Sequence, residues 1–159
     1  MAYEYYVTIT GEKQGAFKGE TPRESQTGKI PCLAFDYGVQ SPRDVATGQP
    51  SGKRQHQPIT ITKEWGASTP QIFQALTTNE RLPSVLFEFV RTTPEGLEEV
   101  HHTIKLTNAT ISSVKQYVGT VKHENTADTH ELEDVSFTFQ QIDLDNKGGS
   151  TSASDNWNA

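Results

Sequence analysis

Alternation of apolar and polar residues over short stretches constrains the fold of this 159-residue chain more than any other feature. In residues 3–10, YEYYVTIT, every second residue is a tyrosine or an aliphatic residue, which is typical of a β-strand with one buried face. Only 33% of the residues are apolar, so the core must be thin. These features predict a small antiparallel β-barrel or sandwich of about seven or more strands. The strands are expected at residues 3–10, 30–40, 59–65, 84–91, 98–107, 109–118 and 132–144.

One segment is expected to form a short α-helix. Ser68 is suited to the N-cap, Pro70 to the first turn, and Gln71 to a capping box with Ser68. The helix would end near Asn79. Its apolar face would consist of Ile72, Phe73 and Leu76.

Two turns are expected between the later strands. Residues 93–96, TPEG, suit a type I turn because proline stands second and glycine fourth, and they would join residues 84–91 and 98–107 into a hairpin. Residues 108–110, NAT, match the glycosylation pattern, but we interpret them as a turn between two strands.

The length predicts one domain, residues 1–145, followed by a flexible polar tail. A chain of 17.6 kDa is long enough for one core and short for two. The tail, residues 146–159, reads NKGGSTSASDNWNA and has the composition of a mobile linker.

Charge and hydropathy argue against several classes of partner. The net charge of −6 makes binding to nucleic acid unexpected. No apolar run approaches the ~18 residues of a membrane helix, so membrane insertion is not expected. The first ten residues lack the basic start and apolar run of a signal peptide. Cys32 is the single cysteine, which excludes an internal disulfide.

The glycine-rich stretch GQPSGKR, residues 48–54, is similar to a phosphate-binding loop but fails its pattern. The glycines are one residue too close, Arg54 stands where a hydroxyl residue is needed, and a strand rather than a helix is predicted next. We therefore expect no nucleotide or other cofactor. The stretch belongs to a long connection without periodicity, residues 41–58, and such connections are often functional.

Titratable residues are frequent, but their pattern predicts neither a metal site nor a catalytic site. The stretch KHENTADTHE, residues 122–131, contains suitable ligand types, yet we expect a solvated loop without the rigidity that a zinc site needs. The ligand types are His123, Glu124, Asp128, His130 and Glu131. No nucleophile motif is present, and Cys32 lies in an apolar segment. A small hydrolase acting through scattered carboxylates stays open.

Taken together, these segments resemble the Hcp family, the haemolysin-coregulated proteins of bacterial type VI secretion. The residues that carry the resemblance are 30–76, 84–91 (SVLFEFVR), 101–118 (HHTIKLTNATISSVKQYV) and 131–144 (ELEDVSFTFQQIDL). The loop KHENTADTHE and the serine-rich tail depart from it. The resemblance implies a small β-barrel with one helix, no catalysis, and hexameric rings that stack into the inner tube of a contractile injection machine.

The resemblance also implies partners and a location. The partners would be other copies of the chain, the tip or spike and sheath proteins of the machine, and small effectors held in the lumen of the tube. The protein would first be present in the bacterial cytoplasm. It would then be exported to the medium or into a target cell without a signal peptide.

A physical argument also favours self-assembly. A thin β domain exposes strand edges, and a closed ring of head-to-tail copies can cover them. The long connection at residues 41–58 is our candidate for the contact between stacked rings. We predict that this interface contains Gln40, Arg43, Asp44, Lys53, Arg54 and His56.

A second interpretation is a monomeric β-sandwich module that binds a glycan or a peptide. Its binding platform would be the tyrosine row Tyr3, Tyr5 and Tyr6, although aromatic residues in strands usually pack in a core or an interface. A measurement of mass in solution separates the two interpretations.

Overall fold

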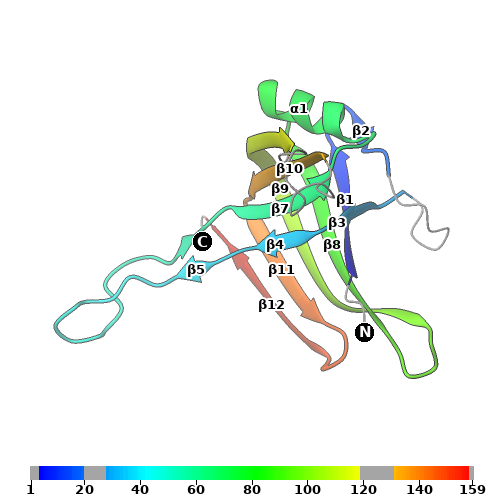
Figure 1. Cartoon of the computed structure of the whole chain (residues 1–159). Helices are drawn as coiled ribbons and strands as arrows, with labels where there is room; N and C mark the ends of the chain where they lie inside the picture. Colours follow the sequence, from blue (N-terminus) through cyan, green and yellow to red (C-terminus); the bar gives the residue numbers. More distant parts are fainter. Residues whose placement is uncertain (1–3, 20–27, 119–130, 158–159) are drawn as a thin grey trace.

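The computed structural model describes residues 4–19, 28–118 and 131–157, and it shows two packed β-layers with one helix (Figure 1). The prediction of a mainly antiparallel β fold with one short helix is confirmed. The elements are β1 (Glu4–Gly11), β2 (Gly15–Ala16), β3 (Ile30–Cys32), β4 (Ala34–Asp36), β5 (Val39–Gln40), β6 (Gln55–His56), β7 (Ile59–Glu64), α1 (Thr69–Thr77), β8 (Leu82–Thr92), β9 (Glu98–Val118), β10 (Glu131–Thr138), β11 (Gln141–Asn146) and β12 (Thr151–Asn156).

The two layers form a sandwich and not a closed barrel. Neighbouring strands follow the open order β2-β1-β8-β9-β10-β7-β4. At one edge β3 pairs with β1, and at the other β4 pairs with β7. The two edges are linked covalently, because β3 and β4 are consecutive pieces of one segment joined at Leu33, rather than by a ladder of hydrogen bonds between them. Of the two forms expected from the sequence, a barrel or a sandwich, the structure shows the sandwich.

Strand β9 belongs to both layers. Its first part pairs with β8 and β11, and its part after residue 109 pairs with β10. Asn108 lies between the two parts with φ of 53°, in the left-handed region that asparagine tolerates better than most residues. The predicted turn at residues 108–110 is wrong, because the hydrogen-bonded ladder continues on both sides and the strand only bends there.

Two other predicted strands are each divided in the structure. Residues 30–40 form β3, β4 and β5, which pair with β1, β7 and β6 respectively. Residues 132–144 form β10 and β11, which pair with different parts of β9. The first segment therefore breaks where its partner strand changes, and the second breaks where the pairing moves from one part of β9 to the other. The hairpin of β8 and β9 through residues 93–96 is confirmed.

Apolar side chains between the layers form one core. In β10 the buried residues alternate, so that Val135 and Phe137 face inward while Ser136 is only partly buried. The ring of Phe137 packs edge-to-face against Phe87 of β8, with 6.0 Å between ring centroids. Burying one such side chain contributes about 1.5–3 kcal/mol before the cost in conformational entropy.

The helix α1 covers one end of the sandwich (Figure 1). Ile72 and Ala75 are its buried residues, whereas Phe73 is 57% exposed, so the predicted apolar face is wrong at that position. The predicted capping box is also absent, since Ser68 makes no capping hydrogen bond and the Gln71 side chain accepts one from the Lys18 amide instead. Among the described residues, no helix has the length and apolar character to span a membrane.

A buried ion pair fixes the start of α1 to the sheet. Lys63 of β7 and Glu133 of β10 are opposite each other in the ladder, and their charged atoms are 2.7 Å apart with both side chains fully buried. The Thr69 hydroxyl donates to the same Glu133 oxygen at 3.0 Å and accepts from the Gly66 amide. This network joins both strands to the first residue of the helix.

The C-terminal segment differs from the sequence expectation. Residues 151–156, expected to be part of a flexible tail, form β12 and pair with β11 in an antiparallel hairpin. Ser150 at the turn has φ of 54°. Because β12 reads TSASDN and lies mostly exposed, it lacks the apolar alternation from which a strand is recognised in sequence.

Candidate functional site

Residues 39–56, which we call the arm, project from the body as an extended hairpin (Figure 1). At its base β5 pairs with β6, with Val39 opposite His56. Farther out, Arg43 and Pro50 form an isolated bridge, and the Ser51 amide donates to the Pro42 carbonyl at 2.9 Å. The connection that lacked periodicity in the sequence is thus an ordered ribbon with little burial.

The tip of the arm is a turn organised by Asp44. Its carboxylate accepts hydrogen bonds from the Ala46 amide at 3.0 Å and the Thr47 hydroxyl at 3.2 Å. Its carbonyl accepts from the amide of Gly48, whose φ of 73° suits glycine. Val45, at the outside of this turn, is fully exposed. The tip therefore presents an aliphatic side chain on a defined backbone.

The base of the arm is attached to β12 through Asp155. One oxygen of its carboxylate lies 2.6 Å from Arg54 Nε and 2.6 Å from His56 Nε2. Since an ionised carboxylate can only accept, the His56 Nε2 proton points at it. On the other side of the ring, His56 Nδ1 is 2.7 Å from the Tyr37 hydroxyl. We call Tyr37, Arg54, His56 and Asp155 the base cluster.

Electrostatics within the base cluster favour a charged Asp155. The hydrogen bond from Arg54, followed by that from His56, lowers the pKa of Asp155 to about 2. The same contact raises the pKa of Arg54. Burial and the nearby Asp155 charge raise the pKa of Tyr37. The attachment is thus ionic at ordinary pH.

Aromatic rings support the base cluster from inside. The His56 ring centroid lies 5.3 Å from that of Phe139 and 5.3 Å from that of Trp157. Phe139 and Trp157 are also in contact, 5.5 Å apart, and the Trp157 amide donates to the Gln140 carbonyl. Trp157 therefore packs into the body at the base of the arm.

The structure divides the six residues predicted for an interface into three groups. Gln40, Arg43 and Lys53 are exposed on the arm, and the Gln40 side-chain amide donates to the Gln55 side chain across the ribbon. Asp44 stabilises the tip. Arg54 and His56 bind β12 of their own chain, and His56 is buried.

Three residues that the sequence did not single out take part in this site: Tyr37, Asp155 and Trp157. Asp155 is about 100 positions away from Arg54, so no local pattern connects them. The one available signal was the aromatic Trp157 in a tail otherwise made of small and polar residues.

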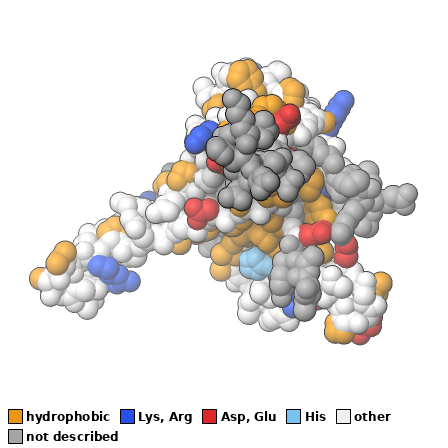
Figure 2. All heavy atoms as spheres, in the orientation of Figure 1, with side chains coloured by type: hydrophobic (Ala, Val, Ile, Leu, Met, Phe, Trp, Pro, Cys, Tyr) orange, Lys and Arg blue, Asp and Glu red, His pale blue; other side chains and the backbone are white. Residues whose placement is uncertain are grey.

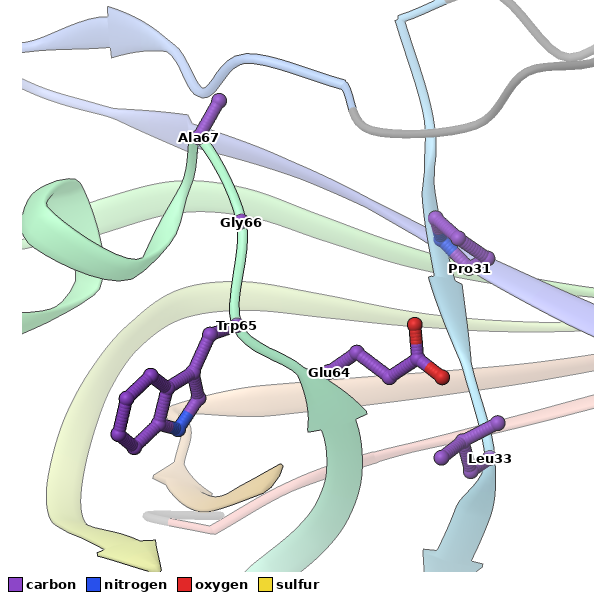
Figure 3. Close-up of a pocket in the computed structure, with 6 residues that line it drawn as sticks. All are labelled: Pro31, Leu33, Glu64, Trp65, Gly66 and Ala67. Carbon is purple, nitrogen blue, oxygen red and sulfur yellow. The ribbon is translucent and has the colours of Figure 1, made fainter. Parts of the chain in front are cut away.

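An open pocket of about 420 Å³ lies beside the start of α1, and we call it the Trp65 pocket. In Figure 3 the Glu64 side chain extends from the end of β7 toward the segment that carries Pro31 and Leu33, with the Trp65 ring on its other side. Leu33 is 60% exposed and Trp65 is 39% exposed. The pocket is lined by Pro31, Leu33, Glu64, Trp65, Gly66 and Ala67.

The other candidate sites from the sequence have different outcomes. The segment GQPSGKR lies on the arm and is followed by strands β6 and β7, as predicted, so it lacks the helix start that a phosphate loop needs. Within the described residues, no three metal-ligating side chains converge. His123, Glu124, Asp128 and His130 lie outside the described residues, and Glu131 begins β10.

Two tyrosines of the predicted platform, Tyr5 and Tyr6, are not available for binding. Tyr5 and Tyr6 are 8% and 3% exposed, and the Tyr5 ring stacks on Phe89 at 5.0 Å. The Tyr5 hydroxyl donates to the Ala34 carbonyl. Tyr3 lies outside the described residues. Tyr5 and Tyr6 thus belong to the core and its rim, and they cannot supply the platform on which a glycan- or peptide-binding module was based.

Comparison with known families gives one match over most of the chain. Residues 6–145 match the family described as "Type VI secretion system effector, Hcp". A curated relative, the "Major exported protein" of Pseudomonas aeruginosa, is 36% identical over 166 residues, which cover 99% of this chain and 96% of the relative.

Solved structures agree with this match. A crystal structure of an Hcp protein superposes with a TM-score of 0.92 at 29% identity and covers 98% of each chain. The secreted protein Hcp3 of Pseudomonas aeruginosa superposes with a TM-score of 0.80 at 30% identity, over 99% of this chain and 100% of that one.

Proposed function

Because the chain belongs to the Hcp family, whose members are structural proteins of the type VI secretion tube and not enzymes, we propose that it forms hexameric rings that stack into a tube. The observation that carries the proposal is the ordered arm with an exposed tip. An extended ribbon that buries little of its own surface is typical of a segment that binds another molecule. The stacking contact is assigned to the arm, with Gln40, Arg43 and Lys53 at the exposed surface.

Free strand edges support the formation of a ring. In the part of the chain that the structure describes, β12 pairs only with β11, and β4 pairs only with β7. Their outer backbone groups can bind a neighbouring subunit, and head-to-tail contacts close into a ring when the rotation between copies fits. The base cluster includes Asp155 of β12, so ring and arm contacts would be adjacent.

We further propose that the tube is exported and carries small effectors in its lumen. Two similar proteins of Pseudomonas aeruginosa, the "Major exported protein" and the secreted protein Hcp3, support export. The protein would act first in the bacterial cytoplasm, with the tip and sheath proteins of the machine as partners. It would reach the medium or a target cell through the machine itself.

A shortened arm tests the proposal. Replacing residues 43–50 with two glycines removes the tip but keeps β5, β6 and Arg54, so the body should fold and the rings should form. Light scattering should give the same ring mass as the unaltered chain. Electron microscopy should show single rings in place of stacks, and export should fall. A chain that stays monomeric at high concentration would overturn the ring, and unchanged stacking would overturn the role of the arm.

A further inference from the structure

We propose that the tip of the arm inserts Val45 into the Trp65 pocket of another copy of the chain, with Arg43 facing Glu64 of that copy. The inference rests on the proposed stacking of rings and names the receptor for the arm. It commits to one contact between two different surfaces of identical molecules.

The tip of the arm presents an exposed aliphatic side chain on an ordered turn, which suits insertion into a pocket. Val45 is fully exposed, although the Asp44 turn around it is ordered by hydrogen bonds from Ala46, Thr47 and Gly48. An aliphatic side chain held out on a fixed turn loses little conformational entropy on binding. Figure 2 shows hydrophobic and basic side chains close together at the end of the arm.

The Trp65 pocket has a rigid wall. The Trp65 indole donates to the Leu132 carbonyl at 2.7 Å, and the Trp65 backbone amide donates to the Glu131 carbonyl at 3.0 Å. On the opposite side the Leu33 amide donates to the Thr62 carbonyl at 2.7 Å. Both walls are thus anchored to the sheet while their apolar faces remain exposed. Such a preformed apolar site with one polar group suits an aliphatic side chain accompanied by a charge.

Opposite charges at the tip of the arm and at the Trp65 pocket favour contact between them. Arg43 lies two positions before Val45, and Glu64 lies directly before Trp65. Within the described residues, neither the Arg43 guanidinium nor the Glu64 carboxylate is in an ion pair. At the tip the Asp44 carboxylate is occupied by hydrogen bonds within the turn, so Arg43 and Val45 are the side chains presented outward, whereas the pocket presents apolar side chains and the Glu64 carboxylate. Charge complementarity of this kind fixes register and orientation between partners.

The direction of the arm requires that the pocket which receives the tip belong to a second copy of the chain. The arm extends away from its own body, so its tip cannot reach its own pocket in this conformation (Figure 1). Every copy carries both a tip and a pocket, and a contact between two such unlike surfaces repeats from copy to copy. Six parallel contacts of this type between two proposed hexameric rings would add one ring to the next.

Charge reversal tests the pairing. Arg43→Glu alone and Glu64→Arg alone should each reduce stacking at least tenfold, measured as the ring concentration at which tubes form. The double variant R43E/E64R should restore it. Lys53→Glu, an equal change of charge on the same arm, serves as the control and should have a smaller effect that E64R does not rescue. Absence of rescue in the double variant would overturn the pairing.

Cross-linking tests proximity directly. In a Cys32→Ala background, Val45→Cys and Leu33→Cys together should give covalent ladders with a short bismaleimide. The control places the second cysteine at Leu97, which is also exposed but lies in the β8–β9 turn. Equal ladders from both pairs would overturn the proposal.

The results separate this inference from the proposed function. If the shortened arm abolishes stacking but neither charge reversal nor cross-linking implicates the pocket, the stacking role stands and the receptor is wrong. If rings themselves do not form, the proposed function fails.

Discussion

Two ion pairs join segments that are distant in the sequence, and they differ in their surroundings. Lys63 and Glu133 are fully buried, with 2.7 Å between their charged atoms. Arg54 and Asp155 are 2.6 Å apart, and about a third of each side chain is exposed. The distances are nearly equal, so distance alone does not reveal what each pair does.

Exposure to solvent determines how much each ion pair contributes to the stability of the fold. A buried charge that loses its partner keeps the full cost of its removal from water, whereas an exposed charge is rehydrated and screened. The buried pair is therefore a condition of the fold, because it joins β7, β10 and α1. The exposed pair instead determines where the arm lies relative to β12. Three predictions test this contrast.

The largest effect is expected from Glu133→Gln. The substitution removes the charge of the carboxylate that lies 2.7 Å from the buried Lys63 ammonium, which should lower the free energy of unfolding by about 3–5 kcal/mol. Urea unfolding followed by circular dichroism measures it. The control is Glu99→Gln, which breaks the exposed pair with Arg91, 2.8 Å in length, and should cost less than about 1 kcal/mol. Equal losses for the two variants would contradict the contrast.

A smaller and more local effect is expected from Asp155→Asn. Arg54 and His56 lose their anionic partner, so the base of the arm should open more often while the core is unchanged. Hydrogen exchange should accelerate in residues 39–56 but not in β7. Asp143→Asn in β11 is the control, since Asp143 contacts Gln141 and not the arm. Unaltered exchange in the arm of the Asp155 variant would show that its position does not depend on this pair.

The smallest effect is a dependence on pH. The pKa of Asp155 is lowered from 3.8 to about 2, chiefly by Arg54. A carboxyl group whose pKa is depressed in the folded state stabilises that state above its ordinary pKa, and the contribution is lost as pH falls through the lowered value. The arm should thus stay attached above about pH 4 and loosen between about pH 4 and 2. Amide chemical shifts of residues 54–56 report it, and Asp155→Asn should remove the transition.

Sequence patterns identified most strands because a half-buried strand alternates regardless of its partner. They did not reveal the breaks at Leu33 and between β10 and β11, since a break depends on which strand, or which part of a long strand such as β9, pairs with each half. They missed β12 because its six residues are exposed or only partly buried and carry no alternation.

The candidate site was predictable in part. Length and lack of periodicity drew attention to residues 41–58, but the same features suggested an irregular loop rather than a ribbon. Arg54 and His56 were singled out for contacts with another chain, whereas their partner in the structure is Asp155 of the same chain. Contacts across about 100 residues depend on topology, which local patterns do not encode.

The continuous strand β9 has a mechanical consequence. It spans 21 residues and is bonded to β8 and β11 in one layer and to β10 in the other. Sliding one layer over the other would require many of these hydrogen bonds to break together, because they lie side by side along one backbone. A subunit pushed along its length would therefore resist shear and move as one rigid block.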